Sequence, residues 1–187
     1  MNKARLETLT DGIIAIVATI MVLELKVPDT TSLDGLISEV PIFVAYISSY
    51  ILVFLMWFMH HNLFMSAKHL TIKTYLYNAL WLFFVTLIPF TNAWVGEGLG
   101  SSIHPIVYDV NVLLGTFAYQ LLNQQIAKDN PDSGRTASYG QKDRIFLYIG
   151  CVASIAVAVF VPIVAIFMMT VILVLMAYRV LTVDMLG

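Results

Sequence analysis

The sequence predicts an all-α integral membrane protein with six transmembrane helices. The chain has 187 residues, of which 59% are apolar and only 12% are charged, and its mean hydropathy is +0.85. A soluble domain is about 45–50% apolar and about 25% charged. Long uncharged segments recur along the chain, and its basic residues collect on alternate connections between them. With a net charge of −2, these features exclude a cytosolic enzyme, a disordered tail and a nucleic-acid-binding protein.

Six segments of the chain have the length and apolarity of a membrane span. A helix needs about 20 apolar residues to cross the hydrocarbon core of a bilayer. Uncharged segments at 40–67, 74–96 and 110–127 approach or exceed this length, and the last extends back past Asp109. We expect a single domain, 1–187, with spans at 5–26, 41–66, 74–96, 103–127, 143–160 and 162–183.

The first of these segments is short for a membrane span. Only 12 uncharged residues separate Asp11 from Glu24. A stretch of this length between two acids is a poor lipid-facing helix, so we expect it to contact protein or water. Acidic residues precede its apolar core and no small-residue cleavage site follows it, so it does not resemble a cleavable signal peptide.

The last two spans come from one uncharged segment at 145–178. Its 34 residues form about 51 Å of helix at 1.5 Å per residue, too long for one ordinary span. Pro162 lies at its middle, and an interior proline breaks or kinks a helix. We therefore expect two spans that meet near Val161 and Pro162, with one long kinked helix as the alternative.

The charges of the connections predict an orientation with both termini in the cytoplasm. Basic residues are enriched in cytoplasmic loops. On the opposite side this orientation leaves only Lys26, and it places nine basic residues in the cytoplasm: Lys3, Arg5, Lys68, Lys73, Lys128, Arg135, Lys142, Arg144 and Arg179.

The first helix carries two stripes of residues at helical spacing. Gly12, Ile16, Thr19 and Leu23 share one face, and the neighbouring stripe consists mostly of small residues, Asp11, Ala15, Ala18 and Val22. Small residues let membrane helices approach closely. One stripe is expected to pack against its own subunit while the other lines a path, although spacing alone favours an ordinary packed helix.

Ionisable residues gather at the cytoplasmic ends of the first two spans. Arg5 and Asp11 begin the first helix, whereas Trp57 and His60 share a face near the end of the second. Because ionisable groups at membrane depth pair or line a path, we expect a polar clasp between the two helices rather than a catalytic site. His60 and His61 are adjacent and point apart, and the single cysteine, Cys151, lies in an apolar run, so no metal site is expected.

The start of the chain resembles the transmembrane-protein-175 family of lysosomal and prokaryotic potassium channels. Arg5-x-x-x-Leu9-Thr10-Asp11 is similar to the Arg-x-x-x-Phe-Ser-Asp signature that opens the first helix of that family. The resemblance continues through 16–23, Trp57-x-x-His60-x-x-x-Phe64, and the pair Asn78 and Pro89. Leu9 and Thr10 replace the phenylalanine and serine of the signature.

The resemblance implies a channel without a carbonyl selectivity filter. Prokaryotic members are similar six-span subunits that form tetramers, with the first helix of each subunit lining a central pore. On this chain the implied constriction is Ile16, Thr19 and Leu23, and the implied gating network is Arg5, Thr10, Asp11, Trp57 and His60. The acidic residues Glu24, Asp29 and Asp34 are expected to concentrate cations at the outer mouth.

The function expected from these residues is a potassium-preferring, homotetrameric cation channel in a prokaryotic plasma membrane. It needs no cofactor, and its partners are membrane lipid, K⁺ and other monovalent cations. Two alternatives stay open. A proton-coupled secondary transporter would use Asp11, Glu24 or His60 as a proton relay, and a membrane scaffold would transport nothing.

Overall fold

The described part of the chain is helical throughout. The computed structural model describes residues 2–25, 27–28, 31–97, 100–133 and 140–186. Within these ranges the helices are α1 (Lys3–Leu23), α2 (Leu33–Ser38), α3 (Val40–Met65), α4 (Ile72–Thr86), α5 (Ile88–Glu97), α6 (Ile103–Asp129), the short 3₁₀ helix η1 (Pro131–Ser133), α7 (Gln141–Ala158) and α8 (Pro162–Leu186). No strand occurs in the ranges described, as expected for an all-α protein.

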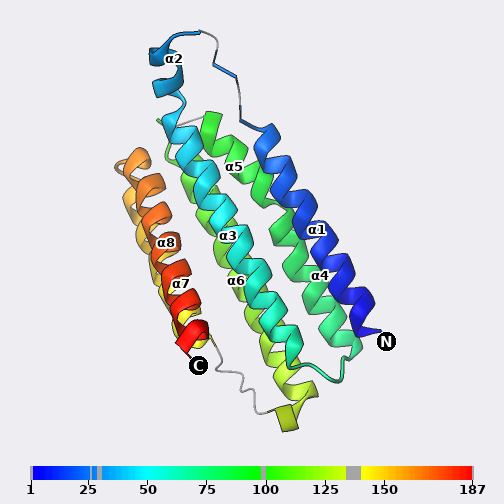
Figure 1. Ribbon diagram of the computed structural model, residues 1–187. Helices are drawn as coiled ribbons and strands as arrows, with labels where there is room; N and C mark the ends of the chain where they lie inside the picture. The colour runs from blue at the N-terminus through cyan, green and yellow to red at the C-terminus, as the bar shows by residue number, and fades with distance from the viewer. Residues whose placement is uncertain (1, 26, 29–30, 98–99, 134–139, 187) are drawn as a thin grey trace.

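The long helices form an up-and-down bundle with both termini at the same end (Figure 1). The α3–α4 and α6–α7 connections also lie at this end, whereas α2, the α5–α6 connection and the α7–α8 turn lie at the other. α3 and α6 form the middle of the bundle, with α1, α4 and α5 on one side and α7 and α8 on the other. The arrangement of the connections therefore matches the alternation that the basic residues predict, while the membrane orientation stays a prediction.

The third expected span is two helices joined by a break. α4 ends at Thr86 and α5 begins at Ile88, with Leu87 between them. Pro89 has no backbone N–H, so the hydrogen bond that would continue the helix at this position is missing. The side-chain amide of Asn111 on α6 donates to the carbonyl oxygen of Phe84 in the last turn of α4, at 3.1 Å. At the break, the backbone carbonyl group of Phe84 therefore accepts a hydrogen bond from the neighbouring helix, α6.

The last two helices form the antiparallel hairpin expected at Pro162. α7 ends at Ala158 and α8 begins at Pro162. Contacts between the two helices join residues whose numbers rise on one and fall on the other. Ser154 Oγ donates to the carbonyl oxygen of Ala165 at 3.3 Å, and a carboxylate oxygen of Asp143 lies 3.3 Å from the Arg179 guanidinium. One long kinked helix is therefore excluded.

Among the described residues, four helical segments are long and apolar enough to cross a membrane: Lys3–Leu23, Val40–Met65, Ile72–Gly96 and Pro162–Val180. α6 carries several polar residues and α7 begins with four charged or polar ones, so neither reaches the same apolarity. The protein is thus a helical membrane protein, and its complete set of six spans stays a prediction. α2 was not expected; none of its residues is buried, and the side chain of Ser32 caps it by accepting from Gly35 N at 3.2 Å.

Candidate pore helix and its anchors

α1 packs against its own subunit through only one of its faces. The buried residues of α1 recur every three or four positions: Leu6, Thr10, Ile14, Val17 and Met21. This face contacts α3, α4 and α5. It coincides with neither of the two stripes read from the sequence, so the expectation that one of those stripes packs α1 against its own subunit is wrong. Both stripes lie outside the buried face.

The expected constriction residues lie on the exposed side of α1, opposite the buried face. Ile16 is 58% exposed and Leu23 is 79% exposed, and Thr19 between them is also exposed. The Thr19 hydroxyl donates to the backbone carbonyl of Ile16 at 2.8 Å. Its proton is therefore used within the helix, and its oxygen lone pairs remain available on the outer face. In a single subunit, this stripe has no protein partner among the described residues.

The small-residue stripe lines an open groove between α1 and α3. The groove has a volume of about 200 Å³. On α1 it is lined by Asp11, Ile14, Ala15 and Ala18, and on α3 by Tyr50, Val53, Phe54 and Trp57. Small side chains on one wall and aromatic side chains on the other leave a surface that another helix or lipid chains can fill.

Asp11 and Trp57 connect α1 to α3 at the mouth of this groove. The indole Nε1 of Trp57 donates to Oδ1 of Asp11 at 3.0 Å. On α3 the Trp57 ring is held between Phe54 and His61, with ring centroids 5.9 Å and 5.7 Å away. Aromatic contacts on both sides fix the direction of the indole N–H, so the bond to the carboxylate is well oriented.

A second, fully buried chain of hydrogen bonds connects α1 to α4 and α3. Asn78 of α4 donates from Nδ2 to Thr10 Oγ1 at 3.1 Å. Its Oδ1 lies 2.9 Å from His60 Nε2. Because an amide oxygen only accepts, Nε2 of His60 carries the proton and donates it. Thr10 and Asn78 have no exposed surface and His60 is 2% exposed, so all three polar groups depend on one another.

Aromatic rings hold the imidazole of His60 in place. The ring of Trp81 stacks on it with a centroid distance of 4.9 Å and an interplanar angle of 4°. Phe64 lies on α3 one turn further along, with a centroid distance of 4.2 Å. His60 was expected in a polar clasp, but no role was expected for Asn78, the residue that joins Thr10 to His60. A buried asparagine in an apolar span was the available signal.

Four of the five residues expected in the gating network take part in these two sets of hydrogen bonds: Asp11 and Trp57 in the first, and Thr10 and His60 in the second. Arg5 takes part in neither. Arg5 is exposed on α1, and no hydrogen bond or ion pair joins it to the described residues. Of the expected outer-mouth acids, Glu24 caps the end of α1 and Asp34 lies in the first turn of α2, both exposed at the end of the bundle away from the termini. Asp29 lies outside the described residues.

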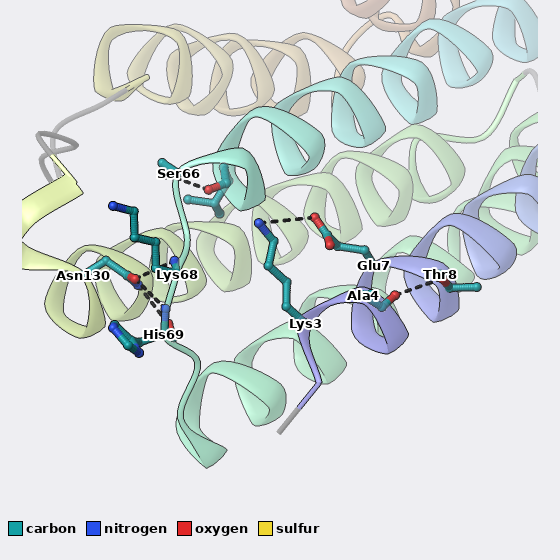
Figure 2. Close-up of polar contacts among 9 residues, drawn as sticks. Lys3, Ala4, Glu7, Thr8, Ser66, Lys68, His69 and Asn130 are labelled. Atoms are coloured by element: carbon teal, nitrogen blue, oxygen red, sulfur yellow. Dashed lines mark hydrogen bonds and ion pairs between the residues drawn. The ribbon is translucent and has the colours of Figure 1, made fainter.

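The end of the bundle that holds the termini is fastened by Asn130 (Figure 2). Its side-chain oxygen accepts from the backbone N–H groups of Lys68 and His69, both at 2.7 Å. Its amide nitrogen donates to the carbonyl oxygens of His69 and Ile126, both at 2.9 Å. The α3–α4 connection is thereby fixed to the end of α6. On α1, Lys3 pairs with Glu7 at 3.9 Å in the same view.

Asp129, beyond the expected span, anchors the start of α4 to the same end of α6. Its Oδ2 accepts from the hydroxyls of Thr74 at 2.6 Å and Thr71 at 2.9 Å, and its Oδ1 accepts from Gln125 at 2.8 Å. Burial raises the pKa of this carboxyl group, but the hydrogen bonds outweigh it, so the pKa of Asp129 lies below its ordinary value. The carboxylate is the form that this junction holds.

Within the described ranges, no group of three or more His, Cys, Asp or Glu side chains is placed to hold a metal ion. The buried His60 is occupied by Asn78, and His61 stacks on Trp57. The residues that the structure brings together around α1 are suited to positioning this helix.

Comparison with known proteins links the chain to one group of channels. The family model described as "Endosomal/lysosomal potassium channel TMEM175" matches residues 5–89. "Potassium channel HX13_20290" of a Chryseobacterium species is 33% identical over 168 residues, which are 89% of this chain and 88% of that protein. The human "Endosomal/lysosomal proton channel TMEM175" is 38% identical over 101 residues, 48% of this chain and 20% of the human protein.

The fold has a counterpart among solved structures. The crystal structure of a lysosomal potassium-selective channel TMEM175 homologue from Chamaesiphon minutus superposes with a TM-score of 0.82 at 23% identity. The match covers 95% of this chain and 97% of that one. At this identity the likeness shows a shared fold.

Proposed function

The chain belongs to the TMEM175 family of membrane channels, and from this premise we propose that it is a potassium-preferring cation channel with α1 as its pore helix. Four subunits surround the pore, and each contributes the exposed face of α1. The constriction is formed by rings of Ile16, Thr19 and Leu23. The observation that carries the proposal is that these three residues lie together on the side of α1 opposite the face that packs on its own subunit.

The membrane arrangement proposed for this channel has six spans per subunit, both termini in the cytoplasm and the protein in a prokaryotic plasma membrane. Both termini lie at the same end of the bundle, as this arrangement requires (Figure 1). Partners are a homotetramer of the chain itself, membrane lipid and monovalent cations, with K⁺ as the permeant ion and no cofactor. The small stripe of α1 and the groove beside it give a neighbouring subunit a surface to contact.

Ion preference in this pore depends on hydration rather than on coordination. Side chains of Ile16 and Leu23 offer no oxygen ligands to replace the water around an ion. Potassium holds its hydration shell less tightly than sodium and so crosses an apolar ring at lower cost. Thr19 lies between the two apolar rings and supplies the only hydroxyl oxygen of the three positions. Slight narrowing of an apolar constriction expels its water and closes it.

Anchoring and cation attraction are assigned to separate groups. Thr10, Asp11, Trp57 and His60 hold the pore helix at the end near the termini, joined through Asn78, and act in gating rather than in permeation. Arg5, exposed near the start of α1, is proposed to complete this network by contacting a neighbouring subunit. Glu24, Asp29 and Asp34 raise the local cation concentration at the opposite mouth.

The test is ion flux from liposomes that contain the purified protein. Passive flux is expected to favour K⁺ over Na⁺, and Ile16→Asn is expected to change conductance or selectivity because it adds a polar group to the constriction. Ile149→Asn is the matched control, since Ile149 is 65% exposed and belongs to α7, which lies on the other side of the bundle. Flux that responds equally to both variants would place the pore elsewhere.

A proton-driven mechanism is the second candidate, favoured by the exposure of the Asp11 carboxylate at the groove mouth and by the name of the human relative, a proton channel. The same liposomes distinguish the two. A transporter gives saturable K⁺ flux that follows an imposed proton gradient, whereas a channel gives K⁺ flux without one.

A further inference from the structure

Asp109 is a carboxyl group enclosed in the apolar interior of the bundle. It lies on α6 and is 1% exposed, and within the described part of the chain its Oδ2 atom has no hydrogen-bond partner. A cavity of about 20 Å³ lies beside it, and the described residues of α3, α5, α6, α7 and α8 turn only apolar surface into this cavity. A buried water molecule needs about two to four polar partners. The cavity therefore offers nothing that would hydrate a charge on Asp109.

The groups that face Asp109 include no positive charge. α3 and α5 contribute the neutral polar residues Ser48 and Asn92 to the wall beside it, and α8 contributes only apolar residues. The titratable groups near it are Tyr108 on α6 and Cys151 on α7, and both are neutral when protonated. Among the described residues that line the cavity there is no Lys, Arg or His. An ionised carboxyl group at membrane depth without a cationic partner is strongly unfavourable. The surroundings of Asp109 thus favour its neutral form.

The hydrogen bonds of Ser154 require the same protonation state. The hydroxyl of Ser154 on α7 is the hydrogen-bond partner of the Asp109 carboxyl group. A serine hydroxyl has a single proton, and Ser154 donates it to the backbone carbonyl of Ala165 on α8 at 3.3 Å. The proton between Ser154 and Asp109 must therefore come from Asp109. A carboxylate has no proton to donate, whereas a carboxylic acid has one.

We propose that Asp109 is a carboxylic acid in the folded protein and that its proton joins α6 to α7 and α8. The acid donates to Ser154 and Ser154 donates to Ala165, so this proton completes a chain of hydrogen bonds across three helices. Loss of the proton leaves Asp109 able only to accept. Ser154 then donates to the carboxylate and releases the carbonyl group of Ala165. The proposal does not depend on the position of the pore, because no described residue of α1 lines the cavity.

Folding and proton binding are linked at Asp109. In the unfolded chain the pKa of an aspartate is about 3.9, so the unfolded chain loses this proton at a pH where the folded protein keeps it. Above that pH, folding takes up one proton until the folded protein also ionises. Each pH unit in this window therefore lowers the folding equilibrium constant about tenfold. For a chain of this length, a tenfold change lowers the unfolding temperature by roughly 3–6 °C.

The direct test is infrared spectroscopy of the purified protein at about pH 6, where exposed carboxyl groups are ionised. A protonated carboxyl group has a carbonyl stretching band well above the carboxylate bands. Such a band is expected in the wild type, and it is expected to be absent from Asp109→Asn. Ser154→Ala removes the acceptor and is expected to shift the band. Asp132→Asn, which changes an exposed residue of η1, is the matched control and is expected to keep the band unchanged.

Thermal unfolding tests the linkage to stability. Asp109→Asn keeps the shape of the side chain, and its amide can donate to Ser154 at every pH. Between about pH 5 and pH 7, the wild type is expected to lose roughly 3–6 °C per pH unit relative to this variant. Histidine residues titrate in both proteins alike, so their effect cancels in the difference.

The proposal is overturned if the wild type has no protonated-carboxyl band at about pH 6, or if the band survives in Asp109→Asn. Equal pH dependence of the two unfolding temperatures overturns it as well. Where Asp109→Asn fails to fold, the band in Ser154→Ala decides, because a band that stays at the wild-type frequency is not that of an acid bonded to Ser154.

Discussion

Replacing Asn78 tests whether the buried chain of hydrogen bonds from Thr10 to His60 holds α1 as one unit. Asn78→Leu keeps the approximate shape of the side chain but leaves the Thr10 hydroxyl and the His60 imidazole without their partner. Both groups are buried. An unsatisfied buried polar group costs about 1–3 kcal/mol, so the variant is expected to lose about 2–6 kcal/mol of stability. For a chain of this length the unfolding temperature falls by roughly 5–20 °C.

The decisive comparison is the double variant Thr10→Val with Asn78→Leu. Thr10→Val alone strands one donor of Asn78 and costs about 1–3 kcal/mol. In the double variant only His60 lacks a partner, so it is expected to be more stable than Asn78→Leu by about 1–3 kcal/mol. Thermal unfolding followed by tryptophan fluorescence measures all three variants. If the two residues acted independently, the double variant would be less stable than Asn78→Leu by the whole free energy that Thr10→Val costs alone. That result would refute the coupling.

Two further predictions concern packing and pH. A Cβ at Gly150 would lie 2.8 Å from Ile172 Cγ2, so Gly150→Ala is expected to push α7 from α8 and cost about 1–3 kcal/mol. A Cβ at Gly12 would meet no atom within 4 Å, so Gly12→Ala serves as the control. Equal unfolding temperatures of the Gly150→Ala and Gly12→Ala variants would contradict the predicted clash. The pKa of Asp129 in the folded protein lies below the ordinary 3.8. Its carboxylate therefore stabilises the junction of α4 and α6 fully above about pH 3.8, and this stabilisation is lost as the pH falls through the pKa of the folded state. Acid unfolding of Asp129→Asn is therefore expected to be less steep than that of wild type, and identical profiles would argue against this.

The sequence predicted those features that depend on local composition. Apolar segments of sufficient length predicted the long helices, and Pro162 inside an uncharged run predicted the α7–α8 hairpin. The adjacency of Asp11 and Trp57 was also expected, because both lie at the same end of their helices. These predictions needed only the length of a helix, its periodicity and the direction in which it runs.

Features that depend on which helices become neighbours were not predicted. Asn78 was noticed as part of a resemblance, but nothing in its spacing indicates that it bridges α1 and α3. Asp109 was treated as a residue within a span, yet it is buried, and residues of five helices line the small cavity beside it. The buried face of α1 was also misjudged, because periodicity identifies the faces of a helix without telling which one its own subunit covers.

The two anchors of α1 restrict how a pore built from this helix can open. Thr10 is bonded to α4 and Asp11 to α3, and these adjacent residues point about 100° apart around the helix. Rotation of α1 about its own axis would break at least one of these two hydrogen bonds. A tilt of α1 that pivots at the level of Thr10 and Asp11 keeps both. Leu23 lies about 18 Å further along the helix. A tilt of about 5° therefore displaces it by about 1.6 Å, while the apolar contacts of Met21, being non-directional, allow the movement. In the proposed pore, each α1 would therefore act as a lever pivoted near the termini, and the pore width would change most at the far end.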